Sequence, residues 1–320
     1  SDQRRLFVAA LTILATSACV SEQGAAADQP KKVILETDMC LDVDDVGALA
    51  TLHALADKGE AEILAVCFNE VHSSGAAAID AINTWYGRGG VPVGIYKGDL
   101  EDPDDSKYLD HVAGFPHDLT KKTAPSALDV YRTVLRAQPD KSVTIISVGF
   151  LNNLYDLLRA DSDLVTRKVT ELVVMGGLVN DNFNLVRHNL VEETEYVTRN
   201  WPTPLVISQH GGETRTGARL SAAAAENPVR EAYYRWFDKQ YKGRSSWDQI
   251  AVLYGVRGLD GYFTEKTSGK GRLRNGYEWQ MKPGSRSYLD AQLSDAEFAD
   301  IIEGLMIKPP AADGGSDRIR

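Results

Sequence analysis

The hydrophobic residues of the chain fall into short runs that are separated by longer segments with helical spacing. Runs rich in β-branched residues occupy 31–37, 61–69, 91–98, 142–149, 169–177 and 203–209, and they predict buried strands. The segments 44–59, 74–90, 150–161 and 190–200 have the apolar periodicity of helices. Strands that alternate with helices form right-handed βαβ units. The pattern therefore predicts an α/β fold with a mostly parallel, Rossmann-like central sheet flanked by helices.

No internal repeat, long linker or shift in composition interrupts this alternation, so we expect one catalytic domain over residues 28–308. Residues 1–27 have the layout of a secretory signal peptide: Arg4 and Arg5, an apolar run over 6–15, and small residues near Ala27. A buried N-terminal helix is the alternative. Export predicts a periplasmic or extracellular protein, with a weak lipoprotein site at Cys19. We expect residues 309–320 to form a flexible tail.

Composition narrows the class of protein. The 320 residues are 43% hydrophobic and 25% charged, which is ordinary for a folded domain with a large core. The formal net charge of −10 argues against nucleic acid or an anionic membrane surface as the main partner. After the leader, no segment reaches the roughly 18 apolar residues that a transmembrane helix needs. Three cysteines show neither a CxxC pair nor a disulfide framework.

An acidic cluster follows the first predicted strand. The stretch ETDMCLDVDD, residues 36–45, holds five carboxylates within ten positions, and their mutual repulsion needs compensation. A solvated helix start would explain only Asp44 and Asp45. An EF-hand loop would need glycine and glutamate at positions where this chain has neither, and a phosphatase with an Asp nucleophile is a weaker alternative. A hard divalent cation fits best, and several carboxylates with backbone carbonyls favour Ca²⁺ over Mg²⁺.

Polar residues also follow the other predicted strands. Asn69 ends the second, the turn 149–153 follows another, Met175 begins the Met-Gly-Gly end of the next, and Glu213 lies in SQHGGE after the last. Ligands of open α/β sheets bind beyond the carboxyl ends of the strands. We therefore expect these residues and the acidic cluster to share one rim of the sheet.

The segment ETDMCLDVDDVGAL resembles the signature of inosine–uridine-type nucleoside hydrolases in its longer variant, Asp-Thr-Asp-x-x-x-Asp-x-Asp-Asp, with Glu36 in place of the first Asp. The resemblance continues through AVCFN, ISVGFLNNL, VVMGG, NFN and SSWDQIAVLYGV, and so spans about residues 31–260. It implies the nucleoside-hydrolase fold, a nucleoside as substrate, a bound Ca²⁺, a role in purine salvage, and a homodimer or homotetramer.

The resemblance also implies a role for each matching residue. Asp38 would act as general base and metal ligand. The other metal ligands would be Asp45, the backbone carbonyl of Val148, and Asp248. Asp44, or Asp42 if the longer loop shifts the register, would accept a hydrogen bond from the ribose. The remaining substrate contacts would come from Asn69, Met175, Asn184, Glu213 and Trp247.

The chain departs from the family pattern near the leaving base and the sugar. Many members have His-Asp where this chain has Trp247-Asp248, and an indole can stack on a purine but cannot protonate it. A packed core aromatic is the alternative for Trp247. Asn182 stands where the family usually has an acid, and His188 stands near a usual Asp. These changes leave the sugar preference open.

The sequence as a whole predicts an exported, calcium-dependent enzyme that hydrolyses the N-glycosidic bond of ribonucleosides through an oxocarbenium-like transition state. Carboxylates around the ribose would stabilise the growing positive charge. Two alternatives remain open. One is hydrolysis of another N- or O-glycoside on the same scaffold, and the other is a metal-dependent nucleoside- or ribose-binding protein without turnover.

Overall fold

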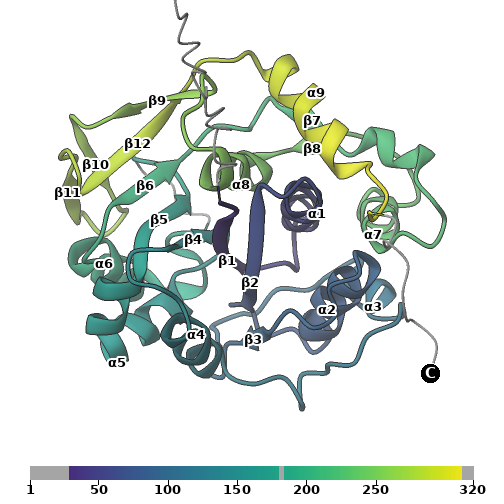
Figure 1. The fold of residues 1–320 in the computed structure, drawn as a ribbon, viewed down its shortest axis with the longest axis horizontal. Helices are drawn as coiled ribbons and strands as arrows, with labels where there is room; N and C mark the ends of the chain where they lie inside the picture. Colours follow the sequence, from purple (N-terminus) through teal and green to yellow (C-terminus); the bar gives the residue numbers. More distant parts are fainter. Residues whose placement is uncertain (1–28, 180–183, 312–320) are drawn as a thin grey trace, which may run out of the picture.

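The computed structural model describes residues 29–179 and 184–311 (Figure 1). The expected signal peptide, Cys19, Asn182 and all but residues 309–311 of the expected tail lie outside the described residues.

An eight-stranded sheet runs through the molecule in the order β3-β2-β1-β4-β5-β6-β12-β9. The pairs from β3 to β12 are parallel, and β9 at the edge is antiparallel to β12. In that order the strands are β3 Val93–Ile95, β2 Ala61–Phe68, β1 Lys31–Thr37, β4 Val143–Ser147, β5 Val169–Met175, β6 Leu205–Ser208, β12 Arg286–Ala291 and β9 Phe263–Lys266. Short two-stranded pairs join β7 Arg215–Thr216 to β8 Arg244–Ser245, and β10 Lys270–Arg272 to β11 Glu278–Gln280.

Helices cover both faces of this sheet (Figure 1). One face carries α1 Asp44–Asp57, α2 Gly75–Trp85, α7 Pro228–Trp236, α8 Trp247–Arg257 and α9 Asp295–Met306, with the single turn α3 Leu109–Val112 beside α2. The other face carries α4 Ala127–Arg136, α5 Asn152–Lys168 and α6 Val191–Asn200. Two 3₁₀ turns, η1 Arg187–Asn189 and η2 Ala218–Ala222, lie in connecting segments. The predicted mostly parallel sheet flanked by helices is confirmed.

Strand β1 shows why these runs are continuously apolar. Val33 and Leu35 pack into the core on the α1 side, whereas Ile34 packs into the core on the α4 side, and all three are fully buried. A parallel strand covered on both faces cannot alternate between apolar and polar residues. Helix α1 is likewise buried almost throughout, between the sheet and helices α8 and α9, and therefore lacks a polar face.

The C-terminal third differs from the predicted alternation. Strand β12 joins the sheet beside β6, and β9 adds the antiparallel edge. Neither strand was predicted, because RSYLDA and FTEK contain mostly polar and charged residues and so lack the apolar run of a central strand.

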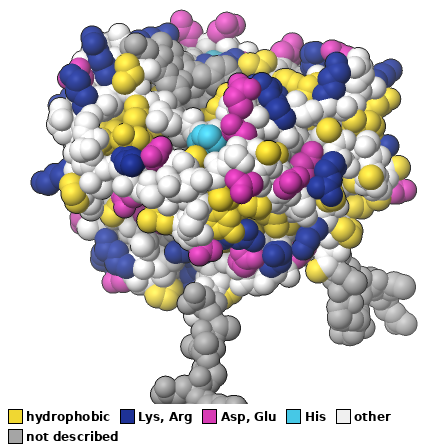
Figure 2. All heavy atoms as spheres, turned by 90° about the horizontal axis from the view of Figure 1, so that it is seen from above, with side chains coloured by type: hydrophobic (Ala, Val, Ile, Leu, Met, Phe, Trp, Pro, Cys, Tyr) yellow, Lys and Arg dark blue, Asp and Glu magenta, His cyan; other side chains and the backbone are white. Residues whose placement is uncertain are grey.

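Figure 2 shows acidic, basic and hydrophobic side chains interspersed over the face seen from above. Within residues 29–179 and 184–311, no helix combines the length and the apolar character that crossing a membrane requires.

Glu36 is a buried hub at the carboxyl end of β1. Its carboxyl accepts hydrogen bonds from Tyr131 Oη at 2.8 Å, Asn69 Nδ2 at 3.0 Å and Asn153 Nδ2 at 3.1 Å. Burial outweighs these donors and raises the pKa of Glu36 to about 8. The hub ties β1 to α4, to the end of β2 and to the start of α5.

This raised pKa gives a stability prediction. Between the ordinary value of 4.5 and about 8, folded Glu36 keeps its proton while the unfolded chain loses it, so stability falls as pH rises. The loss is roughly 1.4 kcal/mol per pH unit within that window. Urea unfolding of wild type and Glu36→Gln at pH 5 and pH 8, at fixed excess calcium, should show a smaller pH effect in the variant. The exposed Glu62→Gln should behave like wild type, and an equal pH effect in Glu36→Gln would refute the assignment.

Candidate metal and nucleoside site

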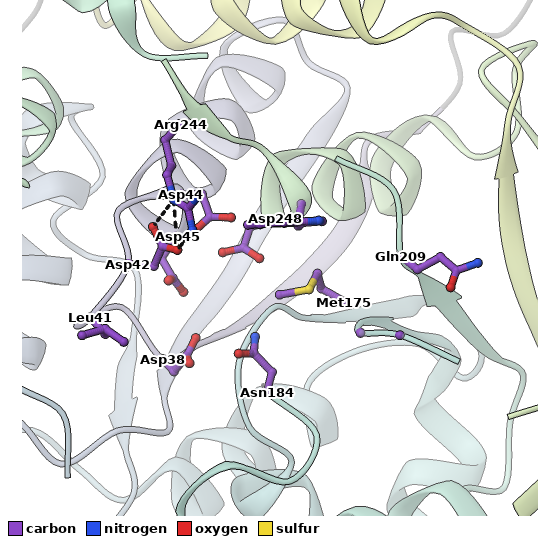
Figure 3. Close-up of a pocket in the computed structure, with 13 residues that line it drawn as sticks. Asp38, Leu41, Asp42, Asp44, Asp45, Met175, Asn184, Gln209, Arg244 and Asp248 are labelled. Carbon is purple, nitrogen blue, oxygen red and sulfur yellow. Dashed lines mark hydrogen bonds and ion pairs between the residues drawn. The ribbon is translucent and has the colours of Figure 1, made fainter. Parts of the chain in front are cut away.

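Two helix N-termini bring three aspartates together. Asp44 and Asp45 begin α1, Asp248 lies in the first turn of α8, and one carboxylate oxygen of each lies within 4.8 Å of the others. Figure 3 shows these side chains pointing toward a shared space with Asp38 below them. The positive ends of two helix dipoles therefore face the acids. Residues about 200 positions apart in the sequence form one cluster.

The close approach of α1 and α8 depends on a glycine in α1. A Cβ at Gly47 would lie 2.2 Å from Gln249 Nε2 and 2.5 Å from Tyr233 Oη, which no side chain could tolerate without movement. Gln249 follows Asp248 directly. The glycine thus sets how near the third aspartate comes to the first two.

The acids border a cavity of about 300 Å³, at the lower end of the range for small-molecule sites. Of the predicted residues, Asp38, Asp42, Asp44, Asp45, Met175, Asn184, Trp247 and Asp248 line it. The remaining lining residues are Leu41, Gly176, Gly177, Gln209 and Arg244. The rim expected from the ends of β1, β5 and β6 is therefore one continuous site.

Burial raises the pKa values of four acids at this cavity, Asp38, Asp44, Asp45 and Asp248. Burial, followed by the charge of Asp104, raises the pKa of Asp38 to about 8. Burial and the neighbouring carboxylates also hold the pKa values of Asp44, Asp45 and Asp248 well above their ordinary range. So many buried acids are stable only with protons or with a cation among them.

The donor atoms fit a hard divalent cation. Asp44 Oδ2 and Asp248 Oδ1 are buried and have no hydrogen-bond partner among the described residues. Asp45 Oδ1 accepts a hydrogen bond from Thr37 Oγ1, which orients that carboxylate. All side-chain donors are oxygens, which is the ligand type that Ca²⁺ and Mg²⁺ take.

Of Asn69, Val148 and Asn184, only Asn184 lines the cavity. Asn69 does not line the cavity; its Nδ2 donates to Glu36 Oε2 at 3.0 Å and to the carbonyl of Phe150 at 2.9 Å. Asn184 Nδ2 donates to the Val148 carbonyl at 2.7 Å. A Cβ at Gly149 would lie 2.5 Å from Asp38 N and 2.7 Å from Asn69 Oδ1, so glycine there allows β1 and β4 to end close together.

Glu213 lies apart from this cavity. It is exposed and does not line the cavity, whereas Gln209 from the same segment does. The sequence predicted that Glu213 would lie at the rim with the rest of SQHGGE. The position of a strand end does not indicate how far along the following loop a site extends.

Arg244 is a site residue that the sequence analysis missed. Its guanidinium pairs with both oxygens of Asp42, with Nε 2.9 Å from Oδ1. The same group lies 5.2 Å from the ring centroid of Trp236 and 5.1 Å from that of Trp247 (Figure 3 shows the ion pair). The only sequence signal was a basic residue four positions before Asp248. Asp42 and Asp44 were the two candidates for the ribose contact. Arg244 neutralises Asp42, so of these two only Asp44 retains an oxygen without a hydrogen-bond partner among the described residues.

Solved structures share this fold at low sequence identity. An inosine-guanosine nucleoside hydrolase is 16% identical with a TM-score of 0.65, covering 86% of this chain and 98% of its own. An inosine-uridine preferring nucleoside hydrolase from Bacillus anthracis is 16% identical with a TM-score of 0.64, covering 86% and 99%. The type III effector protein XopQ, complexed with adenosine diphosphate ribose, is 14% identical with a TM-score of 0.65, covering 89% and 96%.

No curated protein matches the chain in sequence. A family model does: the one described as inosine-uridine preferring nucleoside hydrolase matches residues 33–199, which include the acidic stretch 36–45, Asn69, Val148, Met175 and Asn184 but not Asp248. With this match over more than half of its length, and with the fold and the acidic rim described above, the chain belongs to the inosine-uridine preferring nucleoside hydrolase family.

Proposed function

We propose that the protein is a calcium-dependent nucleoside N-ribohydrolase that releases a free base and ribose. The observation that carries this proposal is the convergence of Asp38, Asp44, Asp45 and Asp248 on one cavity of about 300 Å³. An acid-lined cavity of this kind suits a reaction whose transition state carries positive charge on the sugar.

In this proposal Asp38, Asp45, Asp248 and the Val148 carbonyl hold the metal ion. When bound, calcium would neutralise the buried acids and make a water molecule easier to deprotonate. Asp38, directly after β1, would take a proton from the attacking water as general base. Its position on a buried strand end, with the backbone fixed on both sides, restricts the geometry of the transfer.

Asp44 accepts a hydrogen bond from a ribose hydroxyl through its free Oδ2, since Asp42 is occupied by Arg244. Asn184 and Met175 line the cavity from the opposite side and would contact the sugar. The carboxylates favour the oxocarbenium-like state more strongly than the neutral nucleoside, and this difference accelerates the reaction. Asn69 would support the sugar-binding loop rather than border the cavity.

Trp247 and Arg244 form the wall that would face the leaving base. One indole–guanidinium contact already orders this wall, and a purine offers a flat surface to pack against it. Because Trp247 occupies the position before Asp248, no histidine there could protonate the leaving nucleobase.

A second candidate substrate class is a nucleoside with a phosphate-bearing extension. A neighbouring cavity of about 540 Å³ shares Leu41, Asp42 and Arg244 with the first. Its other charged lining residues are Lys107, which pairs with Asp238 at 3.1 Å, together with Lys242, Asp238 and Asp105. XopQ, which has the same fold, was solved with adenosine diphosphate ribose. The extension would lie in this neighbouring cavity while the ribose occupied the first.

The roles of the metal ligands and of the general base Asp38 are tested separately. A panel of inosine, guanosine, adenosine, uridine and ADP-ribose is incubated with and without chelator, and released base and reducing sugar are measured. Chelation should abolish release, and calcium should restore it. Asp38→Asn should lower kcat by about 10²–10⁴-fold. Asp248→Asn should weaken calcium binding by at least about tenfold.

Asp163→Asn, at an exposed position in α5, is the matched control and should match wild type. Tight nucleoside binding without release would replace the hydrolase with a binding protein. Release of sugar only from substrates that are not nucleosides would favour another glycosidase.

The Asp42–Arg244 pair predicts a non-additive pair of substitutions. Arg244→Lys keeps the charge but loses the bidentate geometry and the contact with both indoles. Arg244→Lys, Asp42→Asn and the double variant should each lower kcat/KM by about tenfold, because each breaks the same pair. The pair Arg235 and Glu231, on the surface of α7, gives control variants with little effect. Additive losses in the double variant would show that the pair does not act as a unit.

We also propose that the protein is exported and self-associates, as its leader and family predict. Expression of the full chain in a Gram-negative host should give a periplasmic product that begins near residue 28, as read by intact mass. Light scattering should give a dimer or tetramer. A cytoplasmic product that retains residues 1–27 would contradict export.

A further inference from the structure

A second group of ligand-type side chains lies beside the nucleoside site but does not line its cavity. Glu70 follows β2, Asp104 lies in the segment before α3, and His188 lies in η1. One ligand atom of each is within 4.8 Å of the others. Their side chains are only 0%, 7% and 3% exposed, respectively. The group therefore joins three separate segments in a nearly water-free position.

Each of the three side chains is held through its other polar atom. Glu70 Oε1 accepts a hydrogen bond from Val71 N at 2.6 Å. Asp104 Oδ1 pairs with the Arg187 guanidinium. His188 Nδ1 lies 2.9 Å from the carbonyl oxygen of Glu101, which can only accept, so Nδ1 carries a hydrogen. The atoms that remain, Glu70 Oε2, Asp104 Oδ2 and His188 Nε2, are the ones that meet.

The meeting atoms are close but not hydrogen-bonded. His188 Nε2 lies 3.3 Å from Glu70 Oε2 and 3.5 Å from Asp104 Oδ2. Even so, Glu70 Oε2 and His188 Nε2 are both buried with no hydrogen-bond partner among the described residues. Within a neutral imidazole bonded through Nδ1–H, Nε2 is an acceptor, and it faces two further acceptors. Such an arrangement calls for a cation at its centre.

We propose that Glu70, Asp104 and His188 form a second metal site that binds a divalent transition metal of the zinc type. Ligands about 2.0–2.2 Å from a tetrahedral zinc ion are about 3.3–3.6 Å apart, which matches both measured separations. One imidazole and two carboxylates suit zinc, whereas calcium takes oxygen ligands only. Three protein ligands leave the fourth position for water.

The surroundings of the group also suit a metal site. Hydrogen bonding of the second imidazole nitrogen to a backbone carbonyl is the usual outer-shell support for a metal-bound histidine. His188 adopts a left-handed backbone conformation with φ of 48°, and its ring packs edge-on against Phe150, so its orientation is fixed from two sides. A surface cavity of about 430 Å³ is lined by Asp104 and His188 and provides a route for the ion.

Bound zinc would connect the end of β2, the segment before α3 and η1 at the edge of the nucleoside site. The competing arrangement is an ion cluster in which a protonated His188 bridges the two carboxylates without metal. The two arrangements differ in whether the folded protein takes up zinc, so metal binding alone decides between them. Zinc binding at this group can be measured whether or not the protein hydrolyses nucleosides.

The test is zinc titration of the full chain after removal of metals, in buffer with excess calcium to fill the first site. Calorimetry should show one equivalent of Zn²⁺, and Co²⁺ should give the intense visible bands of tetrahedral coordination. His188→Gln should weaken zinc binding by at least about tenfold. The exposed His111→Gln is the matched control and should bind as wild type does.

Two further variants make the result decisive. Glu70→Gln is isosteric and should also weaken zinc binding. It provides the test if circular dichroism shows that His188→Gln does not fold. Asp248→Asn should retain zinc binding, because it changes only the nucleoside site. Absence of zinc uptake by wild type, or unchanged uptake by folded Glu70→Gln and His188→Gln, overturns the proposal and leaves the ion cluster. Loss of nucleoside hydrolysis in any variant has no bearing on these readings.

Discussion

The repulsion between buried carboxylates is the constraint on which the rest of this structure depends. Asp38, Asp44, Asp45 and Asp248 are each at most 8% exposed and share one small space, so they cannot all be ionised without a compensating positive charge. The fold supplies part of that charge through the N-termini of α1 and α8. A cation of the type that oxygen ligands bind would supply the remainder.

The sheet and its glycines hold the acids in place against this repulsion. Strand β1 ends at the centre of the sheet, between β2 and β4, so Asp38 follows a backbone fixed on both sides. Gly149 lets the ends of β1 and β4 approach, and Gly47 lets α8 bring Asp248 to α1. Glu36 joins this end of β1 to three neighbouring elements by hydrogen bonds. Rigidity at the rim thus comes from buried contacts behind it rather than from the loop itself.

The acids around the cluster are compensated in different ways. Asp42 pairs with Arg244, whose guanidinium is ordered by two indoles. Asp104 pairs with Arg187, and Glu70 meets His188. The central cluster has no such basic partner among its described neighbours, apart from Arg244 beside Asp42. Arg244 and Arg187 therefore compensate acids at the edge of the site, whereas the acids at its centre would need a cation in addition to the two helix N-termini.

The sequence by itself determined the mostly parallel sheet and the location of the acidic rim, because apolar runs and strand-end positions are local patterns with one structural outcome. The resemblance to nucleoside hydrolases implied that Asp38, Asp45 and Asp248 lie together, and all three line the cavity. The sequence did not reveal β9 and β12, because their mostly polar and charged sequences lack the apolar run by which the other strands were predicted. Only the tertiary structure decided that Arg244 neutralises Asp42, that Glu213 is exposed, and that Glu70, Asp104 and His188 meet. These outcomes depend on side-chain directions across segments tens to hundreds of residues apart, and no local pattern in a single chain records such directions.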